Sequence, residues 1–486
     1  MKINNQTNHL KKEILIRLIK AFNEEDFAKS ARLIPLDMRP KGCEVPYRCC
    51  VHKERAIIKD RTIASLGFSI EDDDERISLS EYAKKSLERE KPDQNVLTVL
   101  EDACKGCEKG KIFVTDLCQG CVARPCVNSC NFGAISIIDG KSVIDQTKCK
   151  KCTKCVNECP YGAIVKVKVP CEDKCPVNAI QKDESGHAKI DFEKCISCGK
   201  CVAACPFGAV HEKSQIIDVL KNIKSGKKVI ALIAPAVAGQ LLGNIYQLRT
   251  AIKKCGFYDV FEVAQGADIT SMNESEDFQK RIVENKDSFM TTSCCAAYNE
   301  LIEKHLQEIK PFVSDTKTPL FYTAQLVKEK YPDSITVFVS PCVAKKKEGM
   351  KNPNVDYVIN CEELGAMFVA FQIELSACDE EKFAYEASKE GREFAITGGV
   401  AQAVIAASKD KGNLVKTLCI NGLNKDSIKA LKRYAKNGKC DEDANLIEVM
   451  SCEGGCVGGN ATLNTSLKAA KRINEFNKDG KSLADF

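Results

Sequence analysis

The sequence predicts three regions of different fold class. A mainly helical segment spans residues 1–100, a cysteine-rich α+β region spans 101–213, and an α/β region of two doubly wound, mostly parallel lobes spans 214–486. Three observations support this division: helical spacing near the N-terminus, a dense block of cysteines, and short apolar runs that alternate with amphipathic helices toward the C-terminus. At 486 residues, the chain is too long for a single hydrophobic core.

The N-terminal segment has the apolar spacing of an amphipathic helix. Leu10, Ile14, Leu18 and Phe22 lie four residues apart and therefore share one helical face. Residues 71–76 are acidic and predict a solvated loop. Three cysteines and a histidine in this segment fit no cluster motif, and we interpret them as structural or incidental residues: Cys43, Cys49, Cys50 and His52.

Sixteen of the 29 cysteines lie between residues 104 and 205. Two runs in this block have the form C-x2-C-x2-C-x3-C-P, which supplies three thiolates to one [4Fe-4S] cubane and the fourth to a partner cubane. The first run is Cys149, Cys152, Cys155 and Cys159, and the second is Cys195, Cys198, Cys201 and Cys205. The block is therefore predicted to be ferredoxin-like.

The other eight cysteines of the block complete the count for four cubanes. A variant run is formed by Cys118, Cys121, Cys126 and Cys130, and a divided one by Cys104, Cys107, Cys171 and Cys175. By pairing similar motifs we expect four sets: Cys149, Cys152, Cys155 with Cys205; Cys195, Cys198, Cys201 with Cys159; Cys118, Cys121, Cys126 with Cys175; and Cys104, Cys107, Cys171 with Cys130.

Disulfides and zinc are the alternative uses of these cysteines. Disulfide scaffolds are usually short, secreted chains, whereas this sequence starts without an apolar signal segment. Zinc sites often include histidine, and only His187 and His211 lie near the block. The apolar stretches are too short to span a membrane. We expect a soluble protein of the reducing cytoplasm.

The charge of the cysteine block suggests an acidic partner. Residues 104–213 carry 17 Lys and Arg against 12 Asp and Glu, a surplus equal to the net charge of +5 of the whole chain. Part of this surplus balances anionic clusters, and the rest would steer an acidic redox partner. No stretch has the length or aromatic content of a nucleic-acid site.

The region after residue 214 has the pattern of parallel sheets covered by helices. Its strand candidates are 228–234, 260–264, 288–292, 335–339, 356–360, 393–397 and 446–450. Such sheets bind ligands beyond the carboxyl ends of their strands. Cysteines follow three of these strands, so one crevice would receive Cys295, Cys342, Cys452 and Cys456 as ligands of a fifth cubane, with Cys294 as a free thiol beside it.

Three motifs in this order resemble the [FeFe]-hydrogenases over roughly residues 104–486. They are TSCC at 292–295, PCVAKKKE at 341–348 and EVMSCEGGC at 448–456. The resemblance implies a ferredoxin hydrogenase that interconverts H2 with protons and electrons at an H-cluster. This cofactor is a cubane joined to a di-iron unit that carries CO, cyanide and an azadithiolate bridge. Maturation proteins, and ferredoxin or a similar acidic electron carrier, are the partners so implied.

The resemblance also assigns roles to residues. Cys456 would bridge the cubane to the di-iron unit, Cys294 would exchange a proton with the bridge amine, and Lys345 would donate a hydrogen bond to a cyanide. The family's proton relay maps onto Glu274, Ser314, Asp277 and Arg281. Further residues expected at the site are Glu348 among the catalytic residues, and Met450, Ala234, Pro235, Ser340 and Pro341 against the cofactor.

Elementary chemistry favours the same roles. Splitting H2 into a proton and a hydride needs an electron sink, a nearby base and a dry pocket. Glu274, Asp277 and Arg281 lie three and four residues apart and can share one helical face. Without the neighbouring motifs, an ordinary exposed ion pair on a helix would be the preferred interpretation.

The chain departs from the family pattern at several positions, which predicts an altered rate, potential or direction of reaction. Asp277 is commonly Glu in the family, and the other departures are Ala296, Tyr298, Ser340, Leu320 and Ala236. Two other functions remain open: an H2-sensing hydrogenase, and a hydrogenase-like assembly protein that binds cubanes but no di-iron unit. The second would have no use for Cys294, Lys345 or a proton relay.

Overall fold

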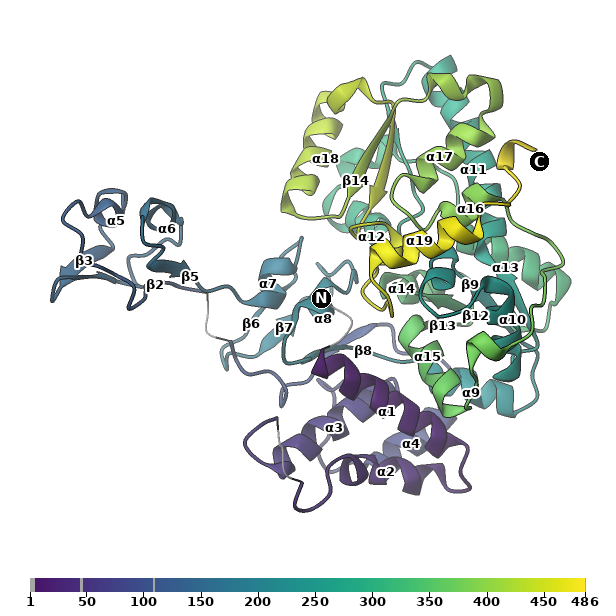
Figure 1. Ribbon diagram of the computed structural model, residues 1–486, viewed down its shortest axis with the longest axis horizontal. Helices are drawn as coiled ribbons and strands as arrows, with labels where there is room; N and C mark the ends of the chain where they lie inside the picture. The colour runs from purple at the N-terminus through teal and green to yellow at the C-terminus, as the bar shows by residue number, and fades with distance from the viewer. Residues whose placement is uncertain (1–4, 44–46, 108–109, 486) are drawn as a thin grey trace.

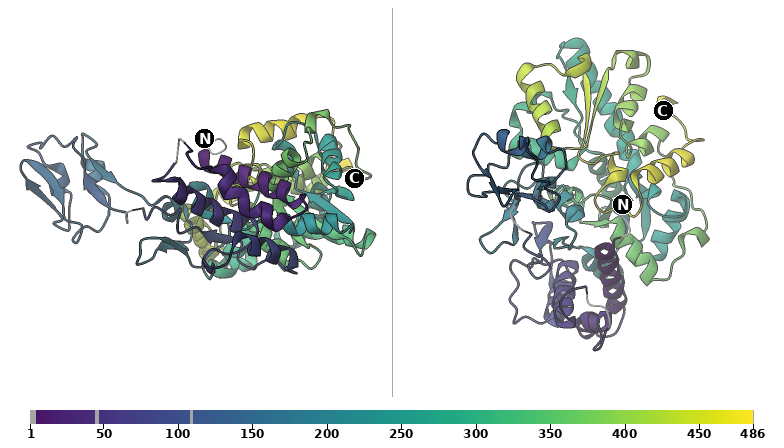
Figure 2. Two further views of the ribbon diagram at one scale, coloured as in Figure 1. Left: turned by 90° about the horizontal axis from the view of Figure 1, so that it is seen from below. Right: turned by 60° about the vertical axis from the view of Figure 1, so that its left-hand side comes forward.

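The computed structural model of the chain describes residues 5–43, 47–107 and 110–485 (Figure 1). An α/β body carries a bundle of N-terminal helices on one side and a slender arm that projects away from it (Figures 1 and 2). The arm contains two small units that hold most of the cysteines. Within the described residues, no helix is both long and apolar enough to cross a membrane.

The N-terminal segment is helical, as the apolar spacing predicts. Its helices are α1 (Gln6–Phe22), α2 (Phe27–Met38), α3 (Val51–Ser65) and α4 (Leu79–Glu88). Leu10, Ile14, Leu18 and Phe22 are all buried. They belong to the same apolar cluster as the body strand at Val229–Ile233, so the segment shares its core with the α/β body.

The two units of the arm are built from short antiparallel hairpins and single-turn helices. The distal unit contains β2 (Ile112–Val114), α5 (Pro125–Asn128), β3 (Ile135–Ile138), β4 (Lys141–Ile144), α6 (Lys154–Glu158) and β5 (Ile164–Lys166). The proximal unit contains β1 (Leu97–Val99), α7 (Pro170–Lys174), β6 (Ile180–Lys182), β7 (Ala188–Ile190), α8 (Lys200–Ala204) and β8 (Val210–Glu212). Since β1 pairs with β8, the distal unit is an insertion within the proximal one.

The body contains two parallel sheets. One has the order β10-β9-β12-β13 and the other β11-β15-β14. Their strands are β9 (Val229–Ile233), β10 (Asp259–Glu262), β11 (Met290–Thr291), β12 (Ile335–Ser340), β13 (Tyr357–Asn360), β14 (Thr417–Asn421) and β15 (Leu446–Met450). The mixed α/β content is confirmed, and the doubly wound form of each lobe stays a prediction.

Two strand assignments from the sequence are wrong. Residues 393–397 are the end of a helix and a turn, because Arg392 is anchored by two hydrogen bonds to the buried Glu262. The strand β14 was not predicted, since it lies at a sheet edge and only one of its five side chains is fully buried.

The remaining helices cover the sheets. They are α9 (Ile216–Lys224), α10 (Ile245–Lys254), α11 (Val263–Phe278), α12 (Ala296–His305), α13 (Pro319–Lys330), α14 (Ala344–Lys351), α15 (Cys361–Ala370), α16 (Lys389–Glu393), α17 (Gly399–Ala407), α18 (Lys425–Asn437) and α19 (Ser466–Phe476).

Candidate functional site

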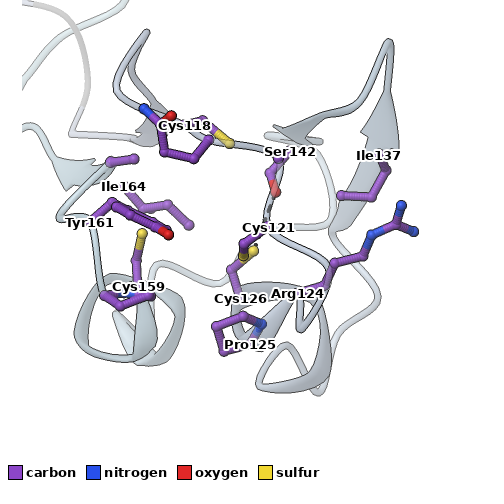
Figure 3. A pocket seen from close by; sticks show the side chains of 14 residues that line it. Cys118, Cys121, Arg124, Pro125, Cys126, Ile137, Ser142, Cys159, Tyr161 and Ile164 are labelled. Carbon is purple, nitrogen blue, oxygen red and sulfur yellow. Dashed lines mark hydrogen bonds between the residues drawn. The ribbon is translucent and has the colours of Figure 1, made fainter.

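The sixteen cysteines of the arm lie in four groups. In the distal unit, one cavity is surrounded by Cys118, Cys121, Cys126 and Cys159 (Figure 3), and another by Cys130, Cys149, Cys152 and Cys155. In the proximal unit, a third cavity is surrounded by Cys175, Cys195, Cys198 and Cys201. The last group, Cys104, Cys107, Cys171 and Cys205, shares one apolar cluster of that unit, and the Cys171 and Cys205 thiols interact electrostatically.

The pairing expected from the sequence is wrong in the fourth ligand of every set. The structure places Cys159 with the Cys118 group, Cys130 with the Cys149 group, Cys175 with the Cys195 group and Cys205 with the Cys104 group. The reason is that each unit of the arm exchanges its C-x3-C cysteines internally, as two-cluster units do. The two units are separated along the arm (Figure 1), and among the described residues none of these three cavities is lined by cysteines of both units.

A larger cavity lies at the carboxyl ends of the body strands. Cys294 and Cys295 follow β11, Cys342 follows β12, and Cys456 follows β15; all four line it. Cys342, Cys295 and Cys456 all act electrostatically on the thiol of Cys452, which places Cys452 beside them. Three distant segments therefore deliver five cysteines to one place, as parallel strands allow.

This cavity is about twice as large as those of the arm. Its empty volume is about 650 Å³, against about 310 to 390 Å³ for the three cavities lined by four cysteines in the arm. The additional space is mostly apolar and is lined by Ala234, Pro235, Pro341, Phe394 and Met450, among others. There is room here for a group larger than one cubane.

Apart from Asp277, the positions that depart from the expected family pattern lie in two places. The cavity wall includes Ala236, Ala296, Leu320 and Ser340. Tyr298 is instead fully buried behind the site, where its hydroxyl lies 3.0 Å from the Thr291 hydroxyl. Four of these substitutions can thus act on a bound group directly, and the tyrosine acts through packing.

Lys345 is held at the cavity by two contacts. Its Nζ lies 2.6 Å from Glu348 Oε2 and donates to the carbonyl oxygen of Cys294 at 3.3 Å. Burial acts to lower the pKa of Lys345, but the Glu348 carboxylate together with the Cys342 and Cys456 thiols raises that pKa overall. Glu348 is itself fixed by the Thr318 hydroxyl, which donates to Oε1 at 2.7 Å. The site therefore holds a permanent positive charge.

The thiol and carboxyl groups at the start of the predicted proton path are buried next to each other. Glu274 is 0% exposed on α11, and no hydrogen bond of normal geometry reaches its carboxyl oxygens within the described residues. Burial raises the pKa of Glu274 to about 8, against the opposing effects of the Ser293 backbone and the Ser314 hydroxyl. Burial, followed by the Glu274 charge, raises the pKa of Cys294 well above its usual range. Both groups can therefore carry a proton near neutral pH.

The residues predicted to continue the proton path form an ion pair near the surface. Arg281 Nε donates to Asp277 Oδ1 at 2.8 Å, and the same guanidinium also pairs with Asp315. Asp277 also acts electrostatically on Glu274, and the Asp315 side chain is 90% exposed. Asp315 was not predicted, because its role depends on the turn after Ser314 rather than on a motif.

Glu448 is a second residue that the sequence reasoning did not single out. It is fully buried, and its carboxylate accepts hydrogen bonds from the backbone N–H groups of Gly398 (2.7 Å) and Ala401 (3.0 Å) at the start of α17. Its charge also acts on Cys294 and Cys456. Its position as the first residue of the motif at 448–456 is the sequence feature that could have indicated Glu448.

The cysteine groups fit iron-sulfur cubanes. Burial, together with neighbouring thiols, raises the pKa of Cys342 to about 11 and that of Cys456 to about 12, so a cationic centre is needed to hold them as thiolates. Among the described side chains, no three His, Cys, Asp or Glu converge on a point as for a single metal ion. Four thiols around a cavity suit a cluster of several iron atoms.

Comparison with known proteins finds hydrogenase and iron-sulfur domain matches along the chain. Residues 227–460 match the C-terminal domain of the iron-only hydrogenase large subunit. Residues 141–164 match a 4Fe-4S binding domain, and residues 166–216 match the LdpA Fe-S cluster-binding domain. The chain is an [FeFe]-hydrogenase-like protein.

Relatives of this [FeFe]-hydrogenase-like protein include two bacterial enzymes. Iron hydrogenase 1 of Clostridium pasteurianum is 29% identical over 320 residues, covering 54% of this chain and 55% of that protein. The periplasmic [Fe] hydrogenase large subunit of Nitratidesulfovibrio vulgaris is 29% identical over 385 residues, covering 68% and 88%. The chain thus spans just over half the length of the first relative. A variant of [FeFe]-hydrogenase HydA1 from Chlamydomonas reinhardtii aligns with 19% identity and a TM-score of 0.45, covering 55% of this chain and 90% of that one.

Proposed function

We propose that the protein is a ferredoxin hydrogenase that interconverts H2 with protons and electrons at an H-cluster. The observation that carries this proposal is the enlarged cavity beside Cys295, Cys342 and Cys456, with the buried Cys294 and Glu274 pair next to it. A scaffold that only stores cubanes would need neither the additional volume nor a buried acid. The three regions 1–100, 101–213 and 214–486 are then a helical segment, an electron-transfer region and the hydrogenase region.

Four cysteines would hold the cubane of this cofactor: Cys295, Cys342, Cys452 and Cys456. The di-iron unit, with its CO, cyanide and azadithiolate ligands, would occupy the remaining apolar space beside Met450, Pro235 and Phe394. When bound, the H-cluster supplies the iron centre for H2 chemistry and takes up or gives back the electrons. We also propose that maturation proteins insert it and that the protein works in the cytoplasm.

The protein's own side chains would manage the proton and the charge. Cys294 stays a neutral thiol because of its raised pKa, so it holds a proton at the cavity wall that it can donate, and it is then reprotonated. Glu274, with a pKa of about 8, can take that proton and pass it toward Ser314, Asp277 and Arg281. Lys345 would hold a negatively charged ligand in place by a charge-assisted hydrogen bond.

The cysteine groups of the arm would carry the electrons. Cys198 acts electrostatically on Cys452, so the Cys195 group adjoins the central site. The order outward through the proximal unit and then the distal unit follows the arm (Figure 1). Ferredoxin or a similar acidic protein would exchange electrons with the outer part of this series.

The infrared spectrum of protein loaded by maturation proteins tests the proposal. We expect CO and cyanide stretching bands between the protein and water absorptions, together with H2 evolution from reduced methyl viologen. A fully loaded sample without the bands would reject the hydrogenase and favour the cubane-binding assembly protein. Bands without turnover would favour an H2 sensor instead.

A further inference from the structure

The distal unit has one cysteine group that is open to solvent. All sixteen cysteines of the two units are within the described residues, and of these Cys152 alone is exposed. Electron transfer between proteins requires a cluster close to the molecular surface. The group of Cys130, Cys149, Cys152 and Cys155 is therefore the most accessible point of the arm for a protein partner.

Four lysines surround this exposed cysteine. Lys148, Lys150, Lys151 and Lys154 alternate with the cluster cysteines, and all four are exposed. Lys148 lies 3.9 Å from an Asp145 carboxylate oxygen, whereas the other three pair with no carboxylate of the described chain. The basic surface continues along a cleft lined by Lys151, Lys166 and Lys168, where Lys168 pairs with Asp173 at 3.3 Å.

The other cavity of the same unit has a different rim. Leu117, Val122 and Tyr161 adjoin the cysteines there and are 61%, 97% and 52% exposed, with Arg124 as the basic residue of the lining. Both cavities would hold equally charged clusters, so balancing cluster charge does not explain why the lysines gather around one of them. Exposed charges without partners instead create a field that attracts an oppositely charged protein.

We infer that the lysine face around Cys152, formed by Lys148, Lys150, Lys151 and Lys154, is the docking surface for an acidic iron-sulfur electron carrier. This inference rests on the proposed function. A reduced carrier bound there gives one electron to the cluster of the Cys149 group; the carrier is oxidised and the cluster is reduced, with no proton transferred. The reverse step operates when H2 is oxidised.

Charge reversal tests the lysine face. The triple variant K150E/K151E/K154E should bind an acidic two-[4Fe-4S] ferredoxin at least about tenfold more weakly at low ionic strength than the parent holoprotein. The difference should shrink at high salt, because screening weakens exposed charges. The control K429E/K432E/K436E reverses three exposed lysines of α18 and should bind like the parent.

Turnover separates this inference from the proposed function. Both variants should evolve H2 from reduced methyl viologen at the parental rate, since this small donor needs no docking surface. If the two triple variants bound ferredoxin with equal affinity, the inference that the lysine face is the docking surface would be wrong. Absence of viologen-driven turnover in the parent protein would instead count against the hydrogenase, while leaving the binding comparison valid.

A second, independent observation concerns the N-terminal helices. Arg61 of α3 is 2% exposed, and its Nη2 donates to the carbonyl oxygens of Phe207 (3.0 Å) and Gly208 (3.4 Å). Arg48 Nη2 also donates to Phe207 O, at 3.3 Å. The backbone that accepts these bonds directly follows the cluster cysteine Cys205.

The positive charge of Arg61 lacks a carboxylate partner of its own. No ion pair within 4.0 Å is formed by Arg61 in the described chain, and the nearby Glu54 is already paired with Arg39 (3.7 Å) and Arg48 (3.4 Å). A buried guanidinium without a counter-charge is costly. Cys205 acts electrostatically on Arg61, so an anionic cluster bound by its group would supply the missing negative charge.

We infer that Arg61 is a positioning residue that raises the reduction potential of the cluster held by Cys104, Cys107, Cys171 and Cys205. Reduction adds negative charge to the cluster, and a nearby buried cation stabilises the reduced form. The N-terminal helices would thereby tune one step of the electron path. This inference rests on cluster binding by the arm and does not depend on the H-cluster.

Redox titration followed by electron paramagnetic resonance tests the role of Arg61. R61Q keeps a neutral donor for Phe207 and should make reduction of one auxiliary cluster about tenfold less favourable, a fall of about 59 mV for one electron. R61K keeps the charge and should shift that potential less. The control R17Q neutralises a half-exposed arginine of α1 and should shift none. Unchanged potentials in R61Q with full iron content would overturn the inference.

Discussion

The cysteine groups of the arm and the cysteines of the body meet different requirements with the same ligand. Each of the three arm cavities that are lined by four cysteines has an empty volume below 400 Å³ and takes its thiols from one small unit. The body cavity has about 650 Å³, receives thiols from three distant segments, and adds Cys294, Glu274 and Lys345. On the proposed function, storing an electron needs only ligands, whereas proton chemistry also needs space, a buried acid and a fixed charge.

Removing the spare thiol should have the largest effect. C294A should lower H2 turnover by about two to four orders of magnitude, the range expected when a group that transfers protons is lost, while the infrared bands of the loaded cofactor remain. Methyl viologen assays and infrared spectra measure the two quantities. The control C255A removes a thiol that is also buried in the core, and it should retain turnover. Turnover at the parental rate in C294A would mean that Cys294 takes no part in proton transfer, so that the cysteines of the body would serve only as ligands, like those of the arm.

Glu274 should come next in effect. E274Q keeps the shape but cannot pass a proton as a carboxyl group, so turnover should fall by about one to two orders of magnitude. E448Q serves as the control for a buried carboxylate that is held by backbone hydrogen bonds and lies outside the predicted proton path; it should reduce turnover less. Equal turnover in E274Q and the parent would remove Glu274 from the proton path.

The same variant should change the dependence of stability on pH. The pKa of Glu274 is raised to about 8 in the folded protein, from 4.5, so the folded state binds more protons than the unfolded state between these values. Stability contributed by this group is complete below pH 4.5 and is lost as the pH rises through 8. Melting temperatures of the parent should therefore fall between pH 6 and 9 more steeply than those of E274Q; identical slopes would contradict the raised pKa.

The corrected cysteine groups predict a smaller, local effect. C159A should damage the cluster of the Cys118 group and leave that of the Cys195 group intact, whereas C175A should do the opposite. Iron counting should give each variant a loss of up to about four iron atoms, the content of one cubane. Electron paramagnetic resonance then distinguishes the clusters; loss of the Cys195 signal in C159A would restore the pairing expected from the sequence.

The smallest effect is expected behind the site. Y298F removes the hydroxyl that lies 3.0 Å from the Thr291 hydroxyl, which should cost about 1 kcal/mol in the free energy of unfolding. Turnover should change by less than about twofold, because Tyr298 does not line the cavity. Chemical denaturation measures the first quantity and viologen assays the second. A large loss of turnover would place this residue in the proton or cofactor chemistry.

The sequence alone indicates which metal-binding residues the protein has and where most of its helices and strands lie. Cysteine spacing indicates the number of clusters, because each run of closely spaced cysteines supplies three ligands to one cluster. Apolar spacing likewise predicts α1 and most body strands, since the period of burial is set by the local backbone. The segment at 393–397 failed because its apolar residues line the cavity rather than a sheet.

The tertiary structure is needed to show which cysteines share a cavity and which distant side chains interact. The fourth ligand of each arm cavity comes from the other half of the same unit, and the insertion of the distal unit between Cys107 and Cys171 is visible only when β1 pairs with β8. The electrostatic interaction of Glu274 with Cys294 and the hydrogen bond of Arg61 to the loop after Cys205 also join distant segments. Such proximity depends on how whole helices and strands pack against each other, so the spacing of residues along the sequence does not predict it.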